Sequence, residues 1–435
     1  MKKGILTALG LCLLFLCACG RLQSPLAGES GQEQDRDSGV AVTLTGSGAE
    51  VKGGGASVSG SVVTIGAVGE YRISGTLDDG QIVVDTGEDK VDVTLVLDGA
   101  QISNSAGPAI LVRQAKNVHV VLARDSENVL TSGTEADLAA ANENRSGAAI
   151  FSEDDLSFEG GGSLTVRGYL NNGITCKDDL KIKGGAITVL SANNGVRASE
   201  SLTVTGGTLS VTAGNDGLKT SSAAKEGKGF IELTDGSVSI RSGGDGVDAV
   251  GELRVTGGSL QTESRQDLVS NGSRKGLKAG TLLSVTGGSV SVRADEDGLR
   301  CDGNIRLSGG SVSIIASTGV QSGVKDSGAG DIEITGGSLF VSAAGQALKA
   351  EGRLSLGGEL LALSNSDKQR RPDAGGPAYV MADIEGAKDE RLLLGMDTII
   401  VPQSFRVLLY ASSSLRTGET FAVQVEDRGY SLTVR

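Results

Sequence analysis

The sequence has very few of the residues that fill the core of an ordinary globular domain. It has no Trp, and its 435 residues include only 7 Phe and 5 Tyr. Proline is scarce as well, with 5 residues against 67 Gly, which excludes collagen-like chains and proline-rich linkers. Hydrophobic residues still make up 38% of the chain, so it is not disordered. A chain of this length is either divided into two or three domains or built from repeats.

Histidine and positive charge are also in short supply. The one histidine, His119, lies in a strand-like run, so histidine-based catalytic triads and histidine-rich metal sites are excluded. Acidic residues outnumber basic ones, 53 against 40, and give a net charge of -13. A field of this sign repels phosphate backbones, so we expect no nucleic-acid partner and an attraction for cations.

The first residues have the pattern of a bacterial export signal. Lys2 and Lys3 precede an apolar stretch, Ile5 to Leu16, that is too short to span a bilayer. The stretch ends at Leu16-Cys17-Ala18-Cys19, which resembles a lipobox, in which the cysteine after a small residue carries the lipid. An ordinary signal peptide with incidental cysteines is the alternative.

If this motif is a lipobox, it sets the boundaries of the N-terminal segments and indicates where the protein is located. We predict a lipoprotein signal peptide over residues 1–18, lipidation at Cys19 and a flexible polar tether over residues 19–40. The protein is then expected in the bacterial cell envelope, facing outside the cytoplasm, with the N-terminal lipid as its contact with the membrane.

Glycine doublets followed by short strands recur along the middle of the chain. Successive doublets are about 22 residues apart, or up to about 30 where insertions occur. Apolar and hydroxyl residues alternate with a period of two, without helical periodicity. Short strands that turn at glycines predict an all-β parallel β-helix over residues 41–366, with the most regular coils over 158–366. The doublets are Gly161-Gly162, Gly184-Gly185, Gly206-Gly207, Gly257-Gly258, Gly287-Gly288, Gly309-Gly310, Gly336-Gly337 and Gly357-Gly358.

The repeat breaks down near Asp367. Residues 367–435 contain strand-like runs such as Phe405 to Tyr410 and hold a disproportionate share of the aromatic residues. The end of a solenoid exposes unpaired strand edges and core side chains, and both need a cover. We therefore predict that residues 367–435 form a small C-terminal β-strand cap.

Equivalent positions of successive coils stack about 4.8 Å apart, so each column of the repeat is a physical row. One column contains Cys176 and Cys301 among other small residues, which indicates an inward position with little room. These cysteines are about five coils, or about 24 Å, apart, too far for a disulfide. We expect two buried structural thiols.

A second column holds amide and carboxylate side chains just before the turn glycines, namely Asn172, Asn194, Asp216, Asp245, Asp267 and Asp297. Carboxylates at this spacing repel one another unless a cation or a basic neighbour intervenes. Turn formation is one explanation, because Asn and Asp before Gly suit tight turns. The other is Ca²⁺, which prefers oxygen ligands. The predicted calcium ligands are Asp216, Asp245, Asp248, Asp267, Asp295 and Asp297.

A third column, a few residues further on, is basic. We predict that it binds the carboxylates or hydroxyls of an extended glycan, with help from Ca²⁺; ordinary surface ion pairing is the alternative. Lys275 lies close to this column in sequence. The predicted glycan-binding residues are Arg197, Lys219, Lys278, Arg300 and Lys349.

The turn motifs resemble those of a family of bacterial, often lipid-anchored, carbohydrate-binding β-helix proteins. The resemblance covers roughly residues 70 to 435 and includes Asn215-Asp216-Gly217-Leu218-Lys219, Gly244-Asp245-Gly246-Val247-Asp248 and Asp295-Glu296-Asp297-Gly298-Leu299-Arg300. It implies a right-handed parallel β-helix that binds calcium and plant polysaccharides such as cellulose or pectin-like acidic chains.

The chain is also similar to calcium-dependent pectate lyases of polysaccharide lyase family nine. That resemblance implies calcium ligands at Asp216, Asp245 and Asp248, followed by a base at Lys275 or Lys278. A lysine acts as a base only when its pKa is depressed. The lyases pair two adjacent aspartates where this chain has Gly244 before Asp245.

These observations favour a monomeric, surface-anchored, non-catalytic protein that binds an extracellular polysaccharide with the help of Ca²⁺. Scarce Tyr and absent Trp argue against stacking on neutral sugar rings and favour charged or hydroxyl-rich chains, including uronic acids. A Ca²⁺-dependent pectate-type lyase and a structural or adhesive solenoid are the alternatives.

Overall fold

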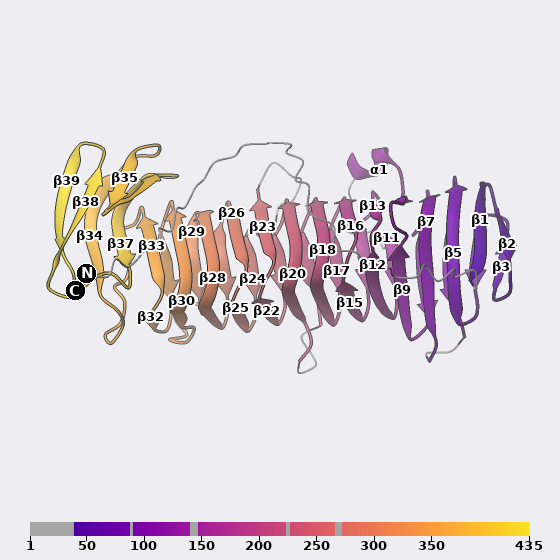
Figure 1. Cartoon of the computed structure of the whole chain (residues 1–435), viewed down its shortest axis with the longest axis horizontal. Coiled ribbons are helices and arrows are strands. Elements are labelled where there is room, and N and C mark those ends of the chain that lie inside the picture. Colours follow the sequence, from indigo (N-terminus) through magenta and orange to yellow (C-terminus); the bar gives the residue numbers. More distant parts are fainter. Residues whose placement is uncertain (1–38, 88–89, 140–146, 223–226, 266–271) are drawn as a thin grey trace, which may run out of the picture.

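The computed structural model describes residues 39–87, 90–139, 147–222, 227–265 and 272–435. The described chain is nearly all β, and its strands stack into an elongated solenoid of about 11 turns (Figure 1). Within it, the single helix is α1 (Glu135–Ala139), and no described helix is long and apolar enough to cross a membrane. The predicted all-β parallel β-helix is confirmed. The predicted signal peptide and Cys19 lie outside the described residues, as does almost all of the tether.

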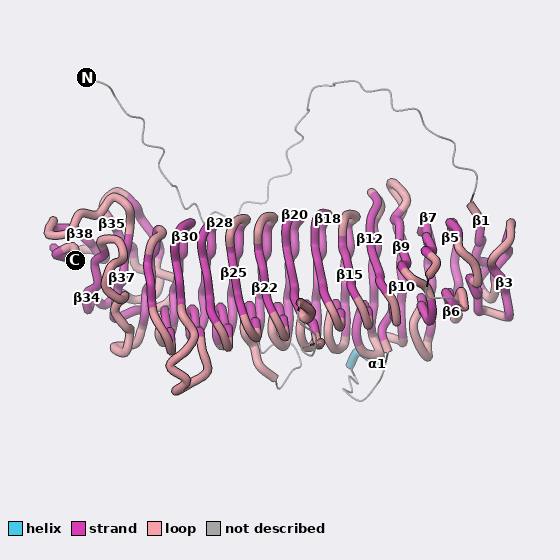
Figure 2. The backbone as a smooth tube through the Cα atoms, turned by 90° about the horizontal axis from the view of Figure 1, so that it is seen from below, coloured by secondary structure: helices cyan, strands magenta, loops and turns pink. Residues whose placement is uncertain are grey.

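Each regular coil contributes strands to two sheets. In one coil, β18 (Ser201–Ala213) belongs to the larger sheet and pairs in parallel with β20 (Phe230–Ser242) of the next coil. After a short turn, β19 (Leu218–Thr220) belongs to the smaller sheet and pairs in parallel with β21 (Val247–Ala249). Figure 2 shows the result as successive rungs along the long axis. A residue and its equivalent in the next coil are therefore neighbours.

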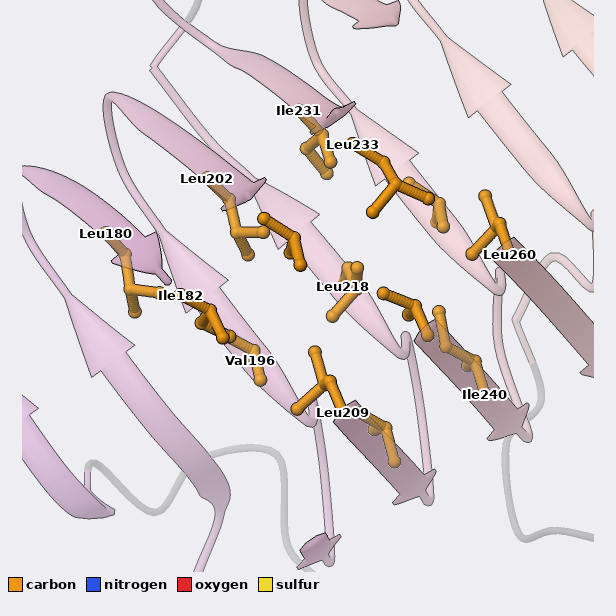
Figure 3. Packing of buried hydrophobic residues seen from close by; sticks show 14 of the residues in the cluster. Leu180, Ile182, Val196, Leu202, Leu209, Leu218, Ile231, Leu233, Ile240 and Leu260 are labelled. Carbon is orange, nitrogen blue, oxygen red and sulfur yellow. The ribbon is translucent and has the colours of Figure 1, made fainter. Parts of the chain in front are cut away.

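Aliphatic side chains fill the interior because alternate residues of each strand point inward. Leu180, Leu202 and Ile231 are paired in register on three successive coils, and all three are buried. Val196 and Leu218 form the corresponding contact from the smaller sheet. Figure 3 shows these rows of branched side chains running along the axis. Each coil thus encloses one layer of branched aliphatic side chains. These side chains fill the interior, so few aromatic residues are needed.

The glycine doublets allow neighbouring coils to approach closely at the bend of the larger sheet. In six of the eight doublets the second glycine has a positive φ, for example +69° at Gly258. A Cβ at this position would lie 2.7 Å from the carbonyl oxygen of Gly236 on the preceding coil. Both the backbone conformation and the lack of space therefore require glycine here.

The two cysteines of the solenoid are free and buried, as expected. Cys176 ends β14 (Asn172–Cys176) and pairs in register with Ala198, while Cys301 ends β27 (Asp297–Cys301) and pairs with Ala279. Each thiol therefore occupies the narrow inward column that the repeat predicted.

Antiparallel strands cover the C-terminal end. The last coil strand, β33 (Glu359–Ser364), pairs with β37 (Phe405–Ala411), which also pairs with β34 (Tyr379–Gly386). A separate four-stranded sheet follows the order β36 (Asp397–Ile400), β35 (Arg391–Leu394), β38 (Thr420–Val425) and β39 (Arg428–Thr433). Phe405 and Val423 belong to a second hydrophobic core beneath these strands.

The N-terminal end of the solenoid is covered by hairpins that the sequence patterns did not indicate. Strand β1 (Val40–Gly46) starts the stack by pairing in parallel with β5 (Gly69–Leu77), and β2 (Ala49–Lys52) folds back antiparallel on β1. The smaller sheet begins with the antiparallel pair β3 (Ala56–Ser59) and β4 (Val62–Ile65).

Candidate functional site

One outward row of the smaller sheet carries the predicted basic residues. Each short strand of this sheet, such as β19 or β24 (Leu277–Ala279), buries its first and third residues and turns its middle residue outward. Strand pairing brings these middle residues side by side from coil to coil. The row, called the basic row below, consists of Arg197, Lys219, Asp248, Lys278, Arg300, Gln321 and Lys349.

A glycine lies at the turn into each of these strands except the last, β31 (Leu348–Ala350), where Ala347 takes its place. At Gly217, a Cβ would lie 2.2 Å from the Ile240 side chain and 2.5 Å from the carbonyl oxygen of Gly246. The glycine lets the turn lie against the core, which fixes the preceding Asp216 and the following Lys219 on the same edge. This is the physical basis of the recurring Asp-Gly-apolar-basic motif.

The amide and carboxylate side chains before these glycines form a hydrogen-bonded ladder. The Asn172 side-chain oxygen accepts the Asn194 N–H at 3.1 Å, and Asn194 accepts the Asp216 N–H at 3.3 Å. Asp216 Oδ1 then accepts the Asp245 N–H at 2.8 Å, and Asp245 Oδ1 accepts the Lys275 N–H at 2.8 Å. Asp216 and Asp245 are thereby held almost fully buried, at 5% and 2% exposure.

The ladder differs from the predicted column at one place. Asp267 lies outside the described residues, and Lys275 occupies the position between Asp245 and Asp297. The carbonyl oxygens of Lys275 and Asp297 accept N–H groups from Gly246 and Gly276, in the same register as the other ladder members. The residues inserted in this coil precede the ladder position, so counting forward from the glycine doublet stops at the wrong residue.

Lysines of the basic row contact the predicted calcium ligands directly. Lys219 Nζ lies 2.5 Å from Asp216 Oδ2 and 2.8 Å from Asp248 Oδ2. Lys278 Nζ lies 3.0 Å from Asp248 Oδ1 and 3.4 Å from Asp245 Oδ2. We call these five residues the Asp/Lys cluster. Asp248 is its centre, because its two oxygens contact different lysines.

Burial and charge act in opposite directions within the cluster. Burial raises the pKa of Asp216, and Lys219 offsets part of that rise. Burial also favours a higher pKa at Asp248, but Lys219 and Lys278 outweigh it and hold the pKa of Asp248 below its usual value. Burial alone would lower the pKa of Lys278, yet Asp248 and Asp245 raise it above the ordinary value. The cluster therefore favours a protonated lysine.

The structure separates the remaining predicted acidic ligands from this cluster. Asp297 is half-buried at the start of β27, beyond Lys275 in the ladder, and burial raises its pKa while Lys275 offsets part of the rise. Asp295 is exposed, with its Oδ2 3.9 Å from Arg274 Nε. Lys275 Nζ contacts Glu296 at 2.9 Å and Ser273 Oγ at 2.6 Å. These residues form a neighbouring group of charges one coil further along.

Gln321 in the basic row was missed by the sequence analysis. Its amide oxygen, in the orientation that satisfies its hydrogen bonds, accepts from Arg300 NH1 at 2.5 Å and from Lys349 Nζ at 3.3 Å. Arg300 also contacts Asp302 at 2.7 Å. The signal was present, because Thr318-Gly319-Val320-Gln321 matches the spacing of Asp297-Gly298-Leu299-Arg300.

A second acidic group, also missed, lies where the chain passes from the smaller to the larger sheet, at the start of β12 (Asp155–Gly160) and β15 (Asp179–Ile182). Atoms of the Asp155, Asp178 and Asp179 carboxylates all lie within 4.8 Å of one another, and this is the single such group found in the described chain. Lys228 contacts Glu200 at 2.6 Å and Asp179 at 3.4 Å beside it. We call these three aspartates, Glu200 and Lys228 the acidic corner.

Comparison with known proteins shows the family to which the chain belongs. A model described as "Carbohydrate-binding domain-containing protein" matches residues 59–323, more than half of the chain, and this range includes the whole Asp/Lys cluster. The chain belongs to this carbohydrate-binding domain-containing protein family. The carbohydrate-binding part of the resemblance seen in the sequence is therefore confirmed.

Two relatives illustrate the extent of the match. A carbohydrate-binding domain-containing protein from Acetivibrio thermocellus is 43% identical over 135 residues, which are 31% of this chain and 47% of the relative. The match therefore spans about half of that relative. The solved structure of a polysaccharide lyase-like protein from C. thermocellum, a gadolinium derivative, is 31% identical, covers 62% of this chain and 96% of that chain, and has a TM-score of 0.46.

Proposed function

We propose that the protein is a surface-anchored, non-catalytic polysaccharide-binding protein that holds an extended, uronic-acid-containing glycan along the basic row with the help of Ca²⁺. The observation that carries the proposal is the row of outward side chains beside the buried aspartates, in which five of the seven members are Arg or Lys and the other two are Asp248 and Gln321. The row has seven members on successive coils, so it extends over about 30 Å at the usual strand spacing. Such a length suits a polymer better than a small molecule.

The chemistry of the row supports an acidic glycan. Arg and Lys donate charge-assisted hydrogen bonds to carboxylates, and none of the row members is aromatic. Carboxylates of the Asp/Lys cluster supply the kind of oxygen ligands that Ca²⁺ prefers. The ion would hold the glycan carboxylates close to the protein carboxylates, which otherwise repel them.

Two features support binding without catalysis. Removal of a sugar proton needs a lysine with a depressed pKa, whereas its acidic neighbours raise the pKa of Lys278. Lys275, the other candidate base, is paired with Glu296 at 2.9 Å. We propose further that the protein acts as a monomer at the bacterial cell envelope, anchored through lipid on Cys19.

The proposal is tested by measuring the affinity for polygalacturonate in Ca²⁺ by calorimetry. The single substitutions Lys278→Ala and Arg300→Ala should each weaken binding at least tenfold, because each removes a charge-assisted contact of about 1.5–3 kcal/mol. The matched control is Lys181→Ala in β15 (Asp179–Ile182), an exposed lysine of the larger sheet, which should bind normally. A loss of affinity in Lys181→Ala equal to the loss in the Lys278 and Arg300 variants would contradict the assignment of this face.

The same samples test the non-catalytic assignment. Polygalacturonate incubated with wild type and Ca²⁺ should give no unsaturated product detectable by ultraviolet absorbance. Product that forms with wild type and disappears in Lys275→Ala or Lys278→Ala would establish a lyase. A glycan panel that includes cellulose and host glycans tests the wider claim, and binding to none of them would favour an adhesive solenoid.

A further inference from the structure

The outward row of the smaller sheet continues beyond the basic row, toward the N-terminal end of the solenoid. Strand pairing places Thr175 beside Arg197, and Phe151 of β11 (Ala148–Ser152) beside Thr175. Leu111 of the preceding coil lies beside Phe151. None of the three added members is charged. We call Leu111, Phe151 and Thr175 the uncharged stretch.

The Phe151 ring gives this stretch an apolar surface. Aromatic residues are scarce in the chain, but the structure places one of the 7 Phe in line with the basic row. The neighbours of Phe151 in its strand, Ile150 and Ser152, are buried, so the ring points outward, and it is half-buried. Lys177 Nζ lies 5.9 Å from the ring centroid, and a cation at an exposed site is held only weakly there. The ring is therefore accessible to a ligand that lies along the row.

The hydrogen-bonded ladder beside the row changes its charge together with the row. Beside the uncharged stretch the ladder consists of amides, and Asn172 Nδ2 donates to Thr175 Oγ1 at 3.1 Å. Beside the basic row it includes carboxylates, and Asp216 contacts Lys219. The same face of the solenoid thus has an uncharged part and a charged part, one after the other along the axis.

We propose that the uncharged stretch binds an uncharged sugar residue, stacked on Phe151, next to the uronic acids that the basic row holds. This subsite rests on the proposed function and narrows its substrate class to glycans in which uncharged sugars adjoin a stretch of uronic acids. The C–H groups of a sugar ring form an apolar face that loses water against an aromatic ring. A uronate at this place would find no cation among the members of the stretch.

The spacing allows one glycan chain to reach both parts of the face. Phe151 and Arg197 lie two coils apart, about 10 Å at the usual strand spacing. Both side chains point outward from consecutive positions of one row. Uncharged and charged units of one extended chain therefore meet different parts of the row in a fixed order.

A fluorescence titration gives the first test. The chain has no Trp, so Phe151→Trp introduces one indole at the proposed subsite. Partially methyl-esterified polygalacturonate, which contains uncharged units, should shift its emission to shorter wavelength as the ring loses water. The matched control is Phe230→Trp, because Phe230 is also half-buried and lies 5.3 Å from a cation, Arg254, but on the larger sheet. No shift at position 151, or equal shifts at both positions, would overturn the subsite.

Calorimetry with two forms of the same polymer gives the second test. Phe151→Ala should weaken binding of the partially esterified form about fivefold, and binding of the unesterified form much less. Phe151→Leu keeps most of the volume and should show the same preference, which separates lost stacking from lost folding. Phe230→Ala should bind both forms as wild type does. A loss of equal size for both forms would contradict a subsite for uncharged sugars.

The outcomes separate the subsite from the proposed function. Binding that depends on Lys278 and Arg300 but not on Phe151 overturns the subsite and leaves the proposed function standing. Wild type that binds neither form of the polymer overturns the proposed function, and the subsite with it.

Discussion

At the scale of single residues, burial inside the coil lowers the reactivity of the two thiols. Burial raises the pKa of Cys176 to about 12 and that of Cys301 to about 11. The Cys176 thiol also donates to the carbonyl oxygens of Asp154 and Asp179, at 3.2 and 3.4 Å. Neither cysteine has the thiolate character or the exposure that a reactive cysteine needs.

We therefore predict that neither thiol is alkylated in the folded protein at pH 8. Iodoacetamide treatment followed by peptide mapping distinguishes these positions from the cysteines near the N-terminus. Both residues should react fully once denaturant is added. Labelling of Cys176 at the same rate with and without denaturant would contradict the buried assignment.

The acidic corner gives a second residue-scale prediction, on pH. Hydrogen bonding with Glu200, followed by burial and the charges of Glu200, Asp155 and Asp179, raises the pKa of Asp178 from 3.8 to about 6. Between these values the folded chain keeps a proton that the unfolded chain has lost. The resulting stabilisation is complete below the unfolded pKa and is lost as the pH rises through about 6.

Asp178→Asn removes the charge that is unfavourable above pH 6, so it should raise the melting temperature at pH 8 and leave it nearly unchanged at pH 3.5. Thermal melts of wild type and variant across this range measure the effect. Asp427→Asn, an exposed substitution near the C-terminus, controls for the change in net charge. A gain that is the same at both pH values would rule out Asp178 as its source.

The sequence predicted the residues of the site better than their partners. Asp216, Asp245 and Asp248 were correctly placed near Lys219 and Lys278 because the repeat has constant spacing through their turns. Asp267 was assigned to the ladder position that Lys275 holds, because an insertion shifts the count in that coil. Ion pairing between the two columns was the alternative that the sequence offered, but which lysine contacts which aspartate could not be predicted, since this depends on the rotamers of long side chains rather than on strand register.

At the scale of the elements, the turn glycines divide into those that need only their backbone conformation and those that also need space. Gly99 has a φ of +76° with no atom within 4 Å of an added Cβ, whereas Gly258 combines a φ of +69° with a backbone atom at 2.7 Å. Gly54 has neither constraint. These three positions separate the cost of conformation from the cost of overlap.

We predict a graded loss of stability for alanine at these positions, measured by denaturant unfolding. Gly54→Ala should be neutral, and Gly99→Ala should cost about 1–2 kcal/mol for the left-handed backbone. Gly258→Ala should cost about 1–3 kcal/mol more, because the added Cβ pushes two coils apart. Equal effects at Gly99 and Gly258 would show that the coils can separate without loss.

The regular coils could be predicted from the sequence, whereas the N-terminal hairpins could not. The regular coils could be located because the doublet, the alternation and the turn glycine repeat together. The hairpins of β1 with β2 and of β3 with β4 could not, since they occur once and lack the doublet. Their strands have the same alternating pattern as the coils, and pairing direction is decided by tertiary contacts.

At the scale of the whole molecule, the cover at the ends of the solenoid determines whether the protein stays monomeric. Every interior coil is paired on both sides, but β33 would present an open edge without the cap strand β37. Leu361 and Leu363 of β33 are buried by the second hydrophobic core. Open edges and exposed apolar side chains both promote association between chains.

We predict that a chain ending at Ser366 loses its monomeric state, whereas the full-length chain is monomeric. Light scattering after size-exclusion chromatography should show larger species or precipitation. The truncated chain with Leu361→Lys and Leu363→Lys should associate much less, because charges on an edge strand oppose pairing with another chain. A truncated chain that remains monomeric and melts cooperatively, without these lysines, would show that the stack does not need residues 367–435 as its cover.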